Sequence, residues 1–218
     1  MFNTDASNLY KNCEKEKFVD YLTKDIKLES IPGEKYQYSN LGMALLAYIV
    51  FKIESRDYES LLQEDIFKPL KMEHSTTQRD LVKYFLVQGY NWKGKLTVNW
   101  DMAEIKGAGA ILSSVSDLAK YLMWNFKALN NQLTLMKQST KTINENLEIA
   151  IRWRILKNKT PKPFLRHNGG TGGYKSSMAI NLDNKTAIII LTNIGATNNP
   201  KKELIDNLCF DLMKFLVK

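Results

Sequence analysis

The sequence predicts an α+β fold, and three observations lead to that prediction. Apolar residues at helical spacing dominate the first two thirds of the chain. The spacing then changes to a period of two in several short stretches, which is typical of strands. A last amphipathic segment follows these strands. We therefore expect a mainly helical lobe, residues 1–145, and antiparallel strands with a covering helix, residues 146–218, as two parts of one domain.

The bulk composition is that of an ordinary globular protein. Of 218 residues, 44% are hydrophobic and 25% are charged, and the net charge is +8. The lysines are scattered along the chain, which favours a solvated surface. The alternative, a nucleic-acid binder, is supported by the net charge and by nothing else in the sequence. Cys13 and Cys209 lack metal-ligand spacing, and Cys209 falls in an apolar helical pattern typical of a buried thiol. The longest apolar run, residues 41–51, is shorter than the ~20 residues of a membrane span.

The helical part is predicted from apolar spacing and capping residues. A polar loop enters a helix within residues 6–24, and residues 41–53, apolar on nearly every side, predict a buried helix after Asn40. Asp57 is a predicted N-cap for a helix that runs to residue 67. Ser114 opens a capping box for another helix. The apolar face of that helix is expected to carry Leu118, Tyr121, Leu122, Phe126 and Leu129.

The strand part is predicted from alternation and turn residues. Residues 149–156, 164–166, 174–182 and 186–192 are the strand candidates, and residues 84–90 are a weaker one. The tight turn at residues 183–185 predicts an antiparallel hairpin. Pro200 then opens a closing helix. We expect its apolar face to consist of Leu204, Ile205, Leu208, Leu212, Phe215 and Leu216.

Residues 167–174 are the stretch most suggestive of a site. They hold four glycines and His167, one of two histidines in the chain. Glycines within a strand pattern indicate either a bulge or a close approach of another group to the backbone. A titratable ring beside bare backbone N–H groups suits acyl chemistry. The alternative is a glycine-rich bulge next to an ordinary surface histidine.

Four short segments occur in a fixed order along the chain. They are Pro32-Gly33-x-x-Tyr36-x-Tyr38-Ser39-Asn40-x-Gly42, Pro69-Leu70-x-Met72-x-x-Ser75-Thr76, Gly107-Ala108-Gly109-Ala110-Ile111-x-Ser113 with Asp117-Leu118-Ala119, and His167-x-Gly169-x-Thr171-Gly172-Gly173. Together they resemble the serine β-lactamase and penicillin-binding protein superfamily, in its class C or D,D-peptidase-like branch. The resemblance covers nearly the whole chain and implies a β-lactamase/transpeptidase-like fold.

The resemblance implies an active site built from three motifs. The first, Ser-x-x-Lys, provides an acylated serine and a lysine that assists its deprotonation. The second, Tyr-x-Asn, matches Tyr38 and Asn40, which implies that Tyr38 relays protons and Asn40 binds the substrate amide. The third, His-x-Gly, matches His167 and Gly169. By that match His167 holds positive charge or a hydrogen bond near Tyr38, and Gly170 offers a backbone N–H to the oxyanion hole.

Each of these residues also has a purely structural interpretation. Tyr38 is one of several nearby tyrosines that need no role, and Asn40 is a good helix N-cap. In the same interpretation His167 is an ordinary surface histidine whose ring has its hydrogen bonds satisfied. We interpret the other histidine, His74, in that way. Gly169 and Gly170 are needed for backbone shape in either case. The glycine context of His167 and the position of Tyr38 before a core helix favour the site.

The chain departs from the family pattern in one respect, because no Ser-x-x-Lys occurs in its 218 residues. We therefore expect a family member without its amino-terminal part, whether a truncated gene model, a fragment or a decayed relative. The expected function is a serine hydrolase that cleaves an amide or ester through an acyl-enzyme, inactive as this chain alone. Its implied substrate is a D-alanyl peptide, a β-lactam or a small ester. The alternative is a non-catalytic pseudoenzyme that binds peptidoglycan-like peptides.

Further expectations concern partners and location. The resemblance implies that neither a metal nor another cofactor is needed, and that the full protein acts outside the cytoplasm, although this chain starts without a signal-peptide pattern. Residues 186–193 are expected to form a strand whose far edge is open in this chain, and several isoleucines make that edge adhesive. Self-association through this edge is therefore predicted.

Overall fold

The structure is a computed structural model that describes residues 8–127, 131–157 and 162–217, and its fold is α+β as predicted. The strands are β1 (Ser139–Asn144), β2 (Leu147–Ala150), β3 (Arg154–Leu156), β4 (Phe164–Gly170), β5 (Lys175–Asn181) and β6 (Thr186–Thr192). The helices are α1 (Lys15–Asp20), α2 (Asn40–Glu54), α3 (Tyr58–Leu62), α4 (Arg79–Val82), α5 (Val115–Trp124), α6 (Asn131–Lys137) and α7 (Leu204–Leu216). The segments η1 (Tyr21–Asp25) and η2 (Gln63–Phe67) are short π-helices, and η3 (Ala103–Ala108) is a 3₁₀-helix.

The six strands form one antiparallel sheet in the order β1-β2-β3-β4-β5-β6. The predicted turn at residues 183–185 joins β5 and β6, and Lys185 there adopts a positive φ of 51°. Strands β4 and β5 pair without a bulge from Leu165↔Ile180 to Gly170↔Lys175. The glycines therefore end a regular strand, and the bulge that was one of two interpretations is absent from this pairing.

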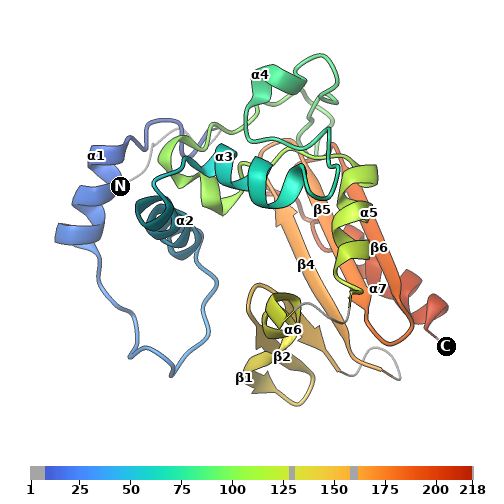
Figure 1. Cartoon of the computed structure of the whole chain (residues 1–218). Helices are drawn as coiled ribbons and strands as arrows, with labels where there is room; N and C mark the ends of the chain where they lie inside the picture. Colours follow the sequence, from blue (N-terminus) through green and yellow to red (C-terminus); the bar gives the residue numbers. More distant parts are fainter. Residues whose placement is uncertain (1–7, 128–130, 158–161, 218) are drawn as a thin grey trace.

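Successive side chains of a strand point to opposite faces of the sheet, and both faces are covered by other segments of the chain. On one face Phe164, Ala179 and Ile188 pack with Cys209 and Met213 of α7. On the other face Leu165 and Ile180 pack with Leu122 of α5, Ala150 and Trp153. Figure 1 shows α5 and α7 on opposite sides of β5 and β6. Both thiols of the chain are free and buried, as predicted for Cys209.

The helical lobe has its own core, in which α2 packs against η3. Phe18, Ala44 and Ile105 are its most deeply buried members. Gly107 permits the close approach, since a Cβ there would lie 2.5 Å from Cβ of Ala47, closer than real Cβ contacts. This packing fixes the start of α2, where the Tyr-x-Asn motif lies.

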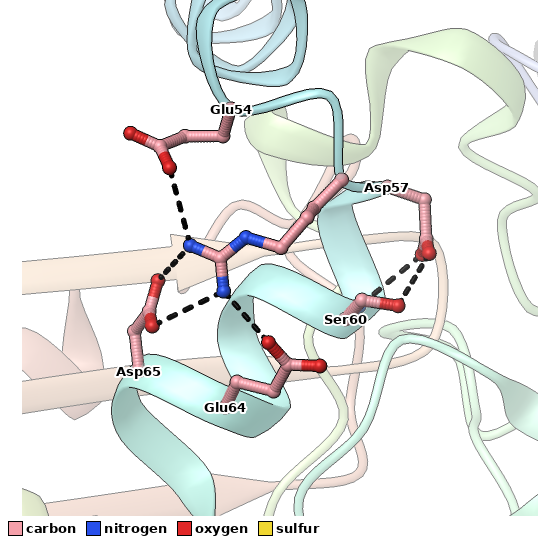
Figure 2. Close-up of polar contacts among 6 residues, drawn as sticks. Glu54, Asp57, Ser60, Glu64 and Asp65 are labelled. Atoms are coloured by element: carbon pink, nitrogen blue, oxygen red, sulfur yellow. Dashed lines mark hydrogen bonds and ion pairs between the residues drawn. The ribbon is translucent and has the colours of Figure 1, made fainter.

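The junction between α2 and α3 is held by charges at the surface (Figure 2). Nη1 of Arg56 lies 2.7 Å from Oε2 of Glu64, and its Nη2 lies 3.0 Å from Oδ2 of Asp65 and 3.4 Å from Glu54. Asp57 then caps α3 as predicted, because its Oδ1 accepts from the backbone N–H groups of Glu59 and Ser60. One arginine thus ties the end of α2 to the turn of helix that follows α3.

Some predicted elements are confirmed and others are wrong. Ser114 caps α5 as predicted, with its Oγ accepting from the backbone N–H of Asp117 at 3.2 Å. The reciprocal half of the predicted capping box is not seen among the described residues, because the carboxylate of Asp117 accepts instead from the backbone N–H of His74 and from Oγ of Ser75. Leu129 lies outside the described residues. The single strand at residues 149–156 is wrong, because Ile151 and Arg152 form a turn between β2 and β3. No strand forms at residues 84–90, where the structure places only an isolated bridge at Tyr90.

The orientation of α7 also differs from the prediction. Most of the expected apolar face is exposed, including Leu204, Leu208, Leu212, Phe215 and Leu216. The helix buries instead the side that carries Asp206, Cys209 and Met213. The boundary between lobes at residue 145 stays a prediction, and the sheet itself begins earlier, at Ser139. In the described part of the chain, no helix has the length and apolarity needed to cross a bilayer.

Candidate active site

The fold brings together the two rings that sequence reasoning placed in one site. Tyr38 precedes Ser39, the N-cap of α2, and is about half exposed, while His167 is the middle residue of β4 and is partly buried. Their ring centroids are 6.4 Å apart with an interplanar angle of 56°. Rings from two distant segments of the chain therefore lie close together.

Asn40 is not the helix cap that the structural interpretation assigned to it. Ser39 is the N-cap of α2, and its Oγ accepts from the backbone N–H of Gly42 at 3.0 Å. The side chain of Asn40 is therefore not used by the cap, and its Nδ2 donates to the hydroxyl of Tyr10 at 3.0 Å. Tyr10 is in turn packed edge-on against Trp100, with ring centroids 5.6 Å apart. Sequence reasoning missed Tyr10, because a contact between residues so far apart leaves no local pattern.

The surroundings of His167 favour its neutral form. Burial lowers its pKa from 6.5 to about 4, and the positive charges of Arg152, Arg154 and Arg166 act in the same direction. The lowered pKa disfavours the positive charge that the resemblance implied for His167, and the hydrogen bond, its other implied role, stays a prediction. Arg152 and Arg154 add positive charge to this region, whereas Arg166 is paired with Asp206.

Gly169 and Gly170 end β4 at exposed positions, where another group comes close to the backbone. A Cβ at Gly170 would lie 2.6 Å from Cβ of Ala196, and one at Gly169 would lie 3.0 Å from Oγ of Ser176. The first of these approaches excludes a side chain at Gly170 unless the segment after β6 moves. Both glycines thus leave the end of β4 as bare backbone.

A buried ion cluster lies behind this strand, on the side of α7. Asp206 is 1% exposed and its carboxylate lies 2.5 Å from Nη2 of Arg166 and 2.9 Å from Nζ of Lys175. It also accepts from Nδ2 of Asn168 at 2.9 Å. Burial alone raises the pKa of Asp206, but the close cations of Arg166 and Lys175 outweigh burial and hold the pKa below its usual value.

Sequence reasoning also missed this cluster, although one signal was present. Asp206 shares a helix face with Cys209 and Met213, at spacings of three and four residues. A carboxylate on an otherwise apolar buried face needs a partner. The identity of those partners, on β4 and β5, is not readable from local sequence.

The fold matches that of solved structures. The chain resembles the octameric penicillin-binding protein homologue from Pyrococcus abyssi with a TM-score of 0.78 and 23% identity, over 93% of this chain and 47% of that one. It resembles the β-lactamase/D-alanine carboxypeptidase from Pseudomonas syringae with a TM-score of 0.77 and 18% identity, over 92% and 65% of the two chains. The fold is therefore β-lactamase/transpeptidase-like, as the resemblance in sequence implied.

Sequence comparison gives the family. The model of the Beta-lactamase family matches residues 2–208, so the chain belongs to that family. It is 26% identical over 208 residues to a putative penicillin-binding protein, PbpX, of Bacillus subtilis, covering 89% of this chain and 49% of the relative. It is 28% identical over 191 residues to the D-alanyl-D-alanine-carboxypeptidase/endopeptidase AmpH of Escherichia coli, covering 78% and 49%. The chain spans about half the length of these curated relatives.

Proposed function

We propose that this chain forms the substrate-binding and proton-transferring side of a serine hydrolase active site, which cleaves an amide or ester through an acyl-enzyme. In this site Tyr38 transfers the proton, and neutral His167 orients the Tyr38 hydroxyl. Asn40 binds the substrate amide, and Gly169 and Gly170 present backbone groups to the reacting carbonyl. The observation that carries the proposal is the approach of the Tyr38 and His167 rings to 6.4 Å. Membership of the β-lactamase family supports the reaction class.

The nucleophile of the proposed reaction lies outside these residues, because the chain contains no Ser-x-x-Lys. The proposal requires that motif in frame upstream of residue 1, and reading the gene there tests it. A reading frame without such a helix contradicts the hydrolase and favours the second candidate, reversible binding of peptidoglycan-like peptides. The extracytoplasmic location proposed for the full protein is checked by cell fractionation.

The charges around His167 support a substrate that bears a carboxylate. Arg152 and Arg154 both contribute to the lowering of its pKa, which supports a positive potential in this region, whereas the charge of Arg166 is paired with Asp206. Arg152 is exposed and has an unusual positive φ of 73° in the β2–β3 turn. A D-alanyl peptide ending in a free carboxylate fits this potential better than a neutral ester does.

The binding step is tested on the chain itself. A peptide ending in D-alanyl-D-alanine is titrated into the 218-residue protein by NMR, beside the same peptide with an amidated end. We expect the free carboxylate to bind more tightly, Arg152→Gln to remove that preference, and Lys83→Gln, an exposed cation on another element, to preserve it. Asn40→Ala is expected to weaken both peptides.

The catalytic step is tested with a fluorescent penicillin. We expect no covalent labelling of this chain, and labelling once a protein containing the upstream motif is used. Covalent labelling of the 218 residues contradicts the assignment of the nucleophile. Equal binding of both peptides contradicts the carboxylate preference but leaves the reaction class standing.

A further inference from the structure

The side-chain amide of Asn40 is held at one end and open at the other. Its Nδ2 donates to the hydroxyl of Tyr10 at 3.0 Å, whereas its Oδ1 has no hydrogen-bond partner in the described part of the chain. Oδ1 is not among the buried atoms that lack a partner, so it is accessible from outside. Because an amide nitrogen carries two N–H groups, Asn40 presents one acceptor and one remaining donor to a ligand.

The hydroxyl that holds Asn40 is fixed by a segment distant in the sequence. The ring of Tyr10 lies edge-on against Trp100, with ring centroids 5.6 Å apart. Two residues before Tyr10, the buried Asn8 contacts Asp101 at two points. Its Nδ2 donates to Oδ2 of the carboxylate and its Oδ1 accepts from the backbone N–H, both at 2.9 Å. Arg79 binds Oδ1 of the same carboxylate at 2.8 Å. Tyr10 is therefore positioned both through its own ring and through its neighbour.

This frame decides which end of the Asn40 amide faces a ligand. A free side-chain amide can turn by half a rotation and exchange its oxygen for its nitrogen, since the two ends have nearly the same shape. With Nδ2 held by Tyr10, that turn breaks a hydrogen bond. We propose that Tyr10 is a positioning residue, which keeps Oδ1 of Asn40 toward the substrate and thereby makes the site select an amide over an ester.

The selection follows from the groups that the two bonds offer. An amide has a C=O and an N–H, which complement the open donor and the open acceptor of Asn40. An ester has an oxygen in place of the N–H, so Oδ1 would lose its contact with water and face a second acceptor. The inference rests on the proposed function, because it requires that Asn40 binds the substrate. It narrows the amide or ester of that proposal to the amide.

The orientation is tested first without a ligand, on the ¹⁵N-labelled 218-residue chain. We expect a nuclear Overhauser effect between the Nδ2 protons of Asn40 and the ring protons of Tyr10, and Asn40→Ala assigns the signal by its loss. Tyr10→Phe keeps the ring against Trp100 and removes the acceptor. It is expected to shift one of the two Nδ2 proton signals and to speed its exchange with water. Tyr48→Phe, which removes a hydroxyl from another ring of the same core, is expected to leave both signals in place.

The selection is tested by titration with N-acetyl-D-alanyl-D-alanine and two analogues, in each of which one backbone N–H is replaced by an ester oxygen. We expect one analogue to bind the parent chain roughly 3- to 10-fold more weakly than the peptide, as the loss of one hydrogen bond implies. Tyr10→Phe frees the amide of Asn40 to turn, so it is expected to remove most of that difference. Tyr48→Phe is expected to preserve it. A purely structural loss at Tyr10 would weaken peptide and ester alike and leave their ratio unchanged.

The outcomes separate this inference from the proposed function. The inference is overturned if the Nδ2 signals do not respond to Tyr10→Phe, if both analogues bind the parent chain like the peptide, or if the ratio survives in Tyr10→Phe. Peptide binding that is unchanged in Asn40→Ala contradicts the proposed role of Asn40, whatever the Nδ2 signals show. The Overhauser effect is measured on the parent chain, so misfolding of Tyr10→Phe does not remove the test, and its absence contradicts the positioning.

Discussion

The side-chain amide of Asn168 donates a hydrogen bond to the carboxylate of Asp206, 2.9 Å away. The middle residue of the His-x-Gly motif is thereby attached to the C-terminal helix, and His167 and Gly169 on either side of it are left to face the proposed active site. Since Arg166 and Lys175 bind the same carboxylate, α7 holds both strands that border the glycine turn.

Replacing this carboxylate is expected to destabilise the whole domain. Asp206→Asn leaves the buried cations of Arg166 and Lys175 without a counter-charge, and breaking a buried pair in this way costs about 3–5 kcal/mol. Urea denaturation measures the loss. Asp211→Asn, which alters an exposed carboxylate on the same helix, is the matched control and is expected to change stability little. Similar midpoints for the two variants would show that the cluster is not a stabilising one.

The neutral state of His167 predicts a pH dependence. Its pKa is near 4 in the folded protein and near 6.5 unfolded, so the unfolded chain binds the extra proton between these values. This contribution to stability is present above pH 6.5 and is lost as the pH falls toward 4. At about 1.4 kcal/mol per pKa unit it amounts to roughly 3 kcal/mol.

The measurement of that prediction is an NMR titration of the imidazole. The His74→Gln variant leaves His167 as the single imidazole and so assigns the signal. His167→Gln is expected to flatten the acid limb of the stability curve. A midpoint at or above 6.5 would contradict both the burial argument and the neutral role of His167.

The open edge of the sheet predicts self-association of this chain. In the described residues β6 pairs with β5 alone, and Leu191 on it is 37% exposed. Unpaired backbone groups beside apolar side chains recruit a second strand. Leu191→Lys is expected to lower the sedimentation-derived mass, whereas Leu81→Lys, on exposed α4, is expected to leave it unchanged. A monodisperse monomer of the parent chain at high concentration would remove the basis for this prediction.

The cap of α3 predicts a smaller, local effect. Asp57→Ala removes the acceptor for the N–H groups of Glu59 and Ser60, which is expected to cost about 1 kcal/mol. Thermal unfolding checks it against Glu29→Ala, a change at an exposed carboxylate outside the helices. An equal effect of both substitutions would mean that Asp57 acts only through its charge.

Elements with strong local signals were predictable from the sequence. The N-cap at Ser114 and the strand Thr186–Thr192 after its tight turn are found where they were expected. The β2–β3 turn was not, because Ile151 and Arg152 carry no turn signal and Arg152 takes a positive φ that β-carbon-bearing residues rarely adopt. A hydrogen bond from the backbone N–H of Ala150 to the carbonyl of Trp153 closes this turn, in which Ile151 and Arg152 are both exposed. Long-range contacts with β4, β5 and β6 decide which face of α7 is buried.

The site was predictable only where residues match motifs. Tyr38 and His167 were placed together from the resemblance, and their rings do meet. The charge state of His167 was not predictable, since it depends on burial and on arginines brought close by folding. Tyr10 and Asp206 were invisible for the same reason: each acts through a partner on a distant segment.

The dependence of β4 and β5 on Asp206 has a consequence for biosynthesis. A ribosome emits the chain from its amino end, so both strands are made before the carboxylate that neutralises their buried cations exists. Until α7 has been synthesised, Arg166 and Lys175 lack the carboxylate that compensates their burial, and α7 does not yet hold the strands that border the glycine turn. The proposed active site therefore matures among the last events of synthesis, and nascent chains halted before residue 206 should lack it.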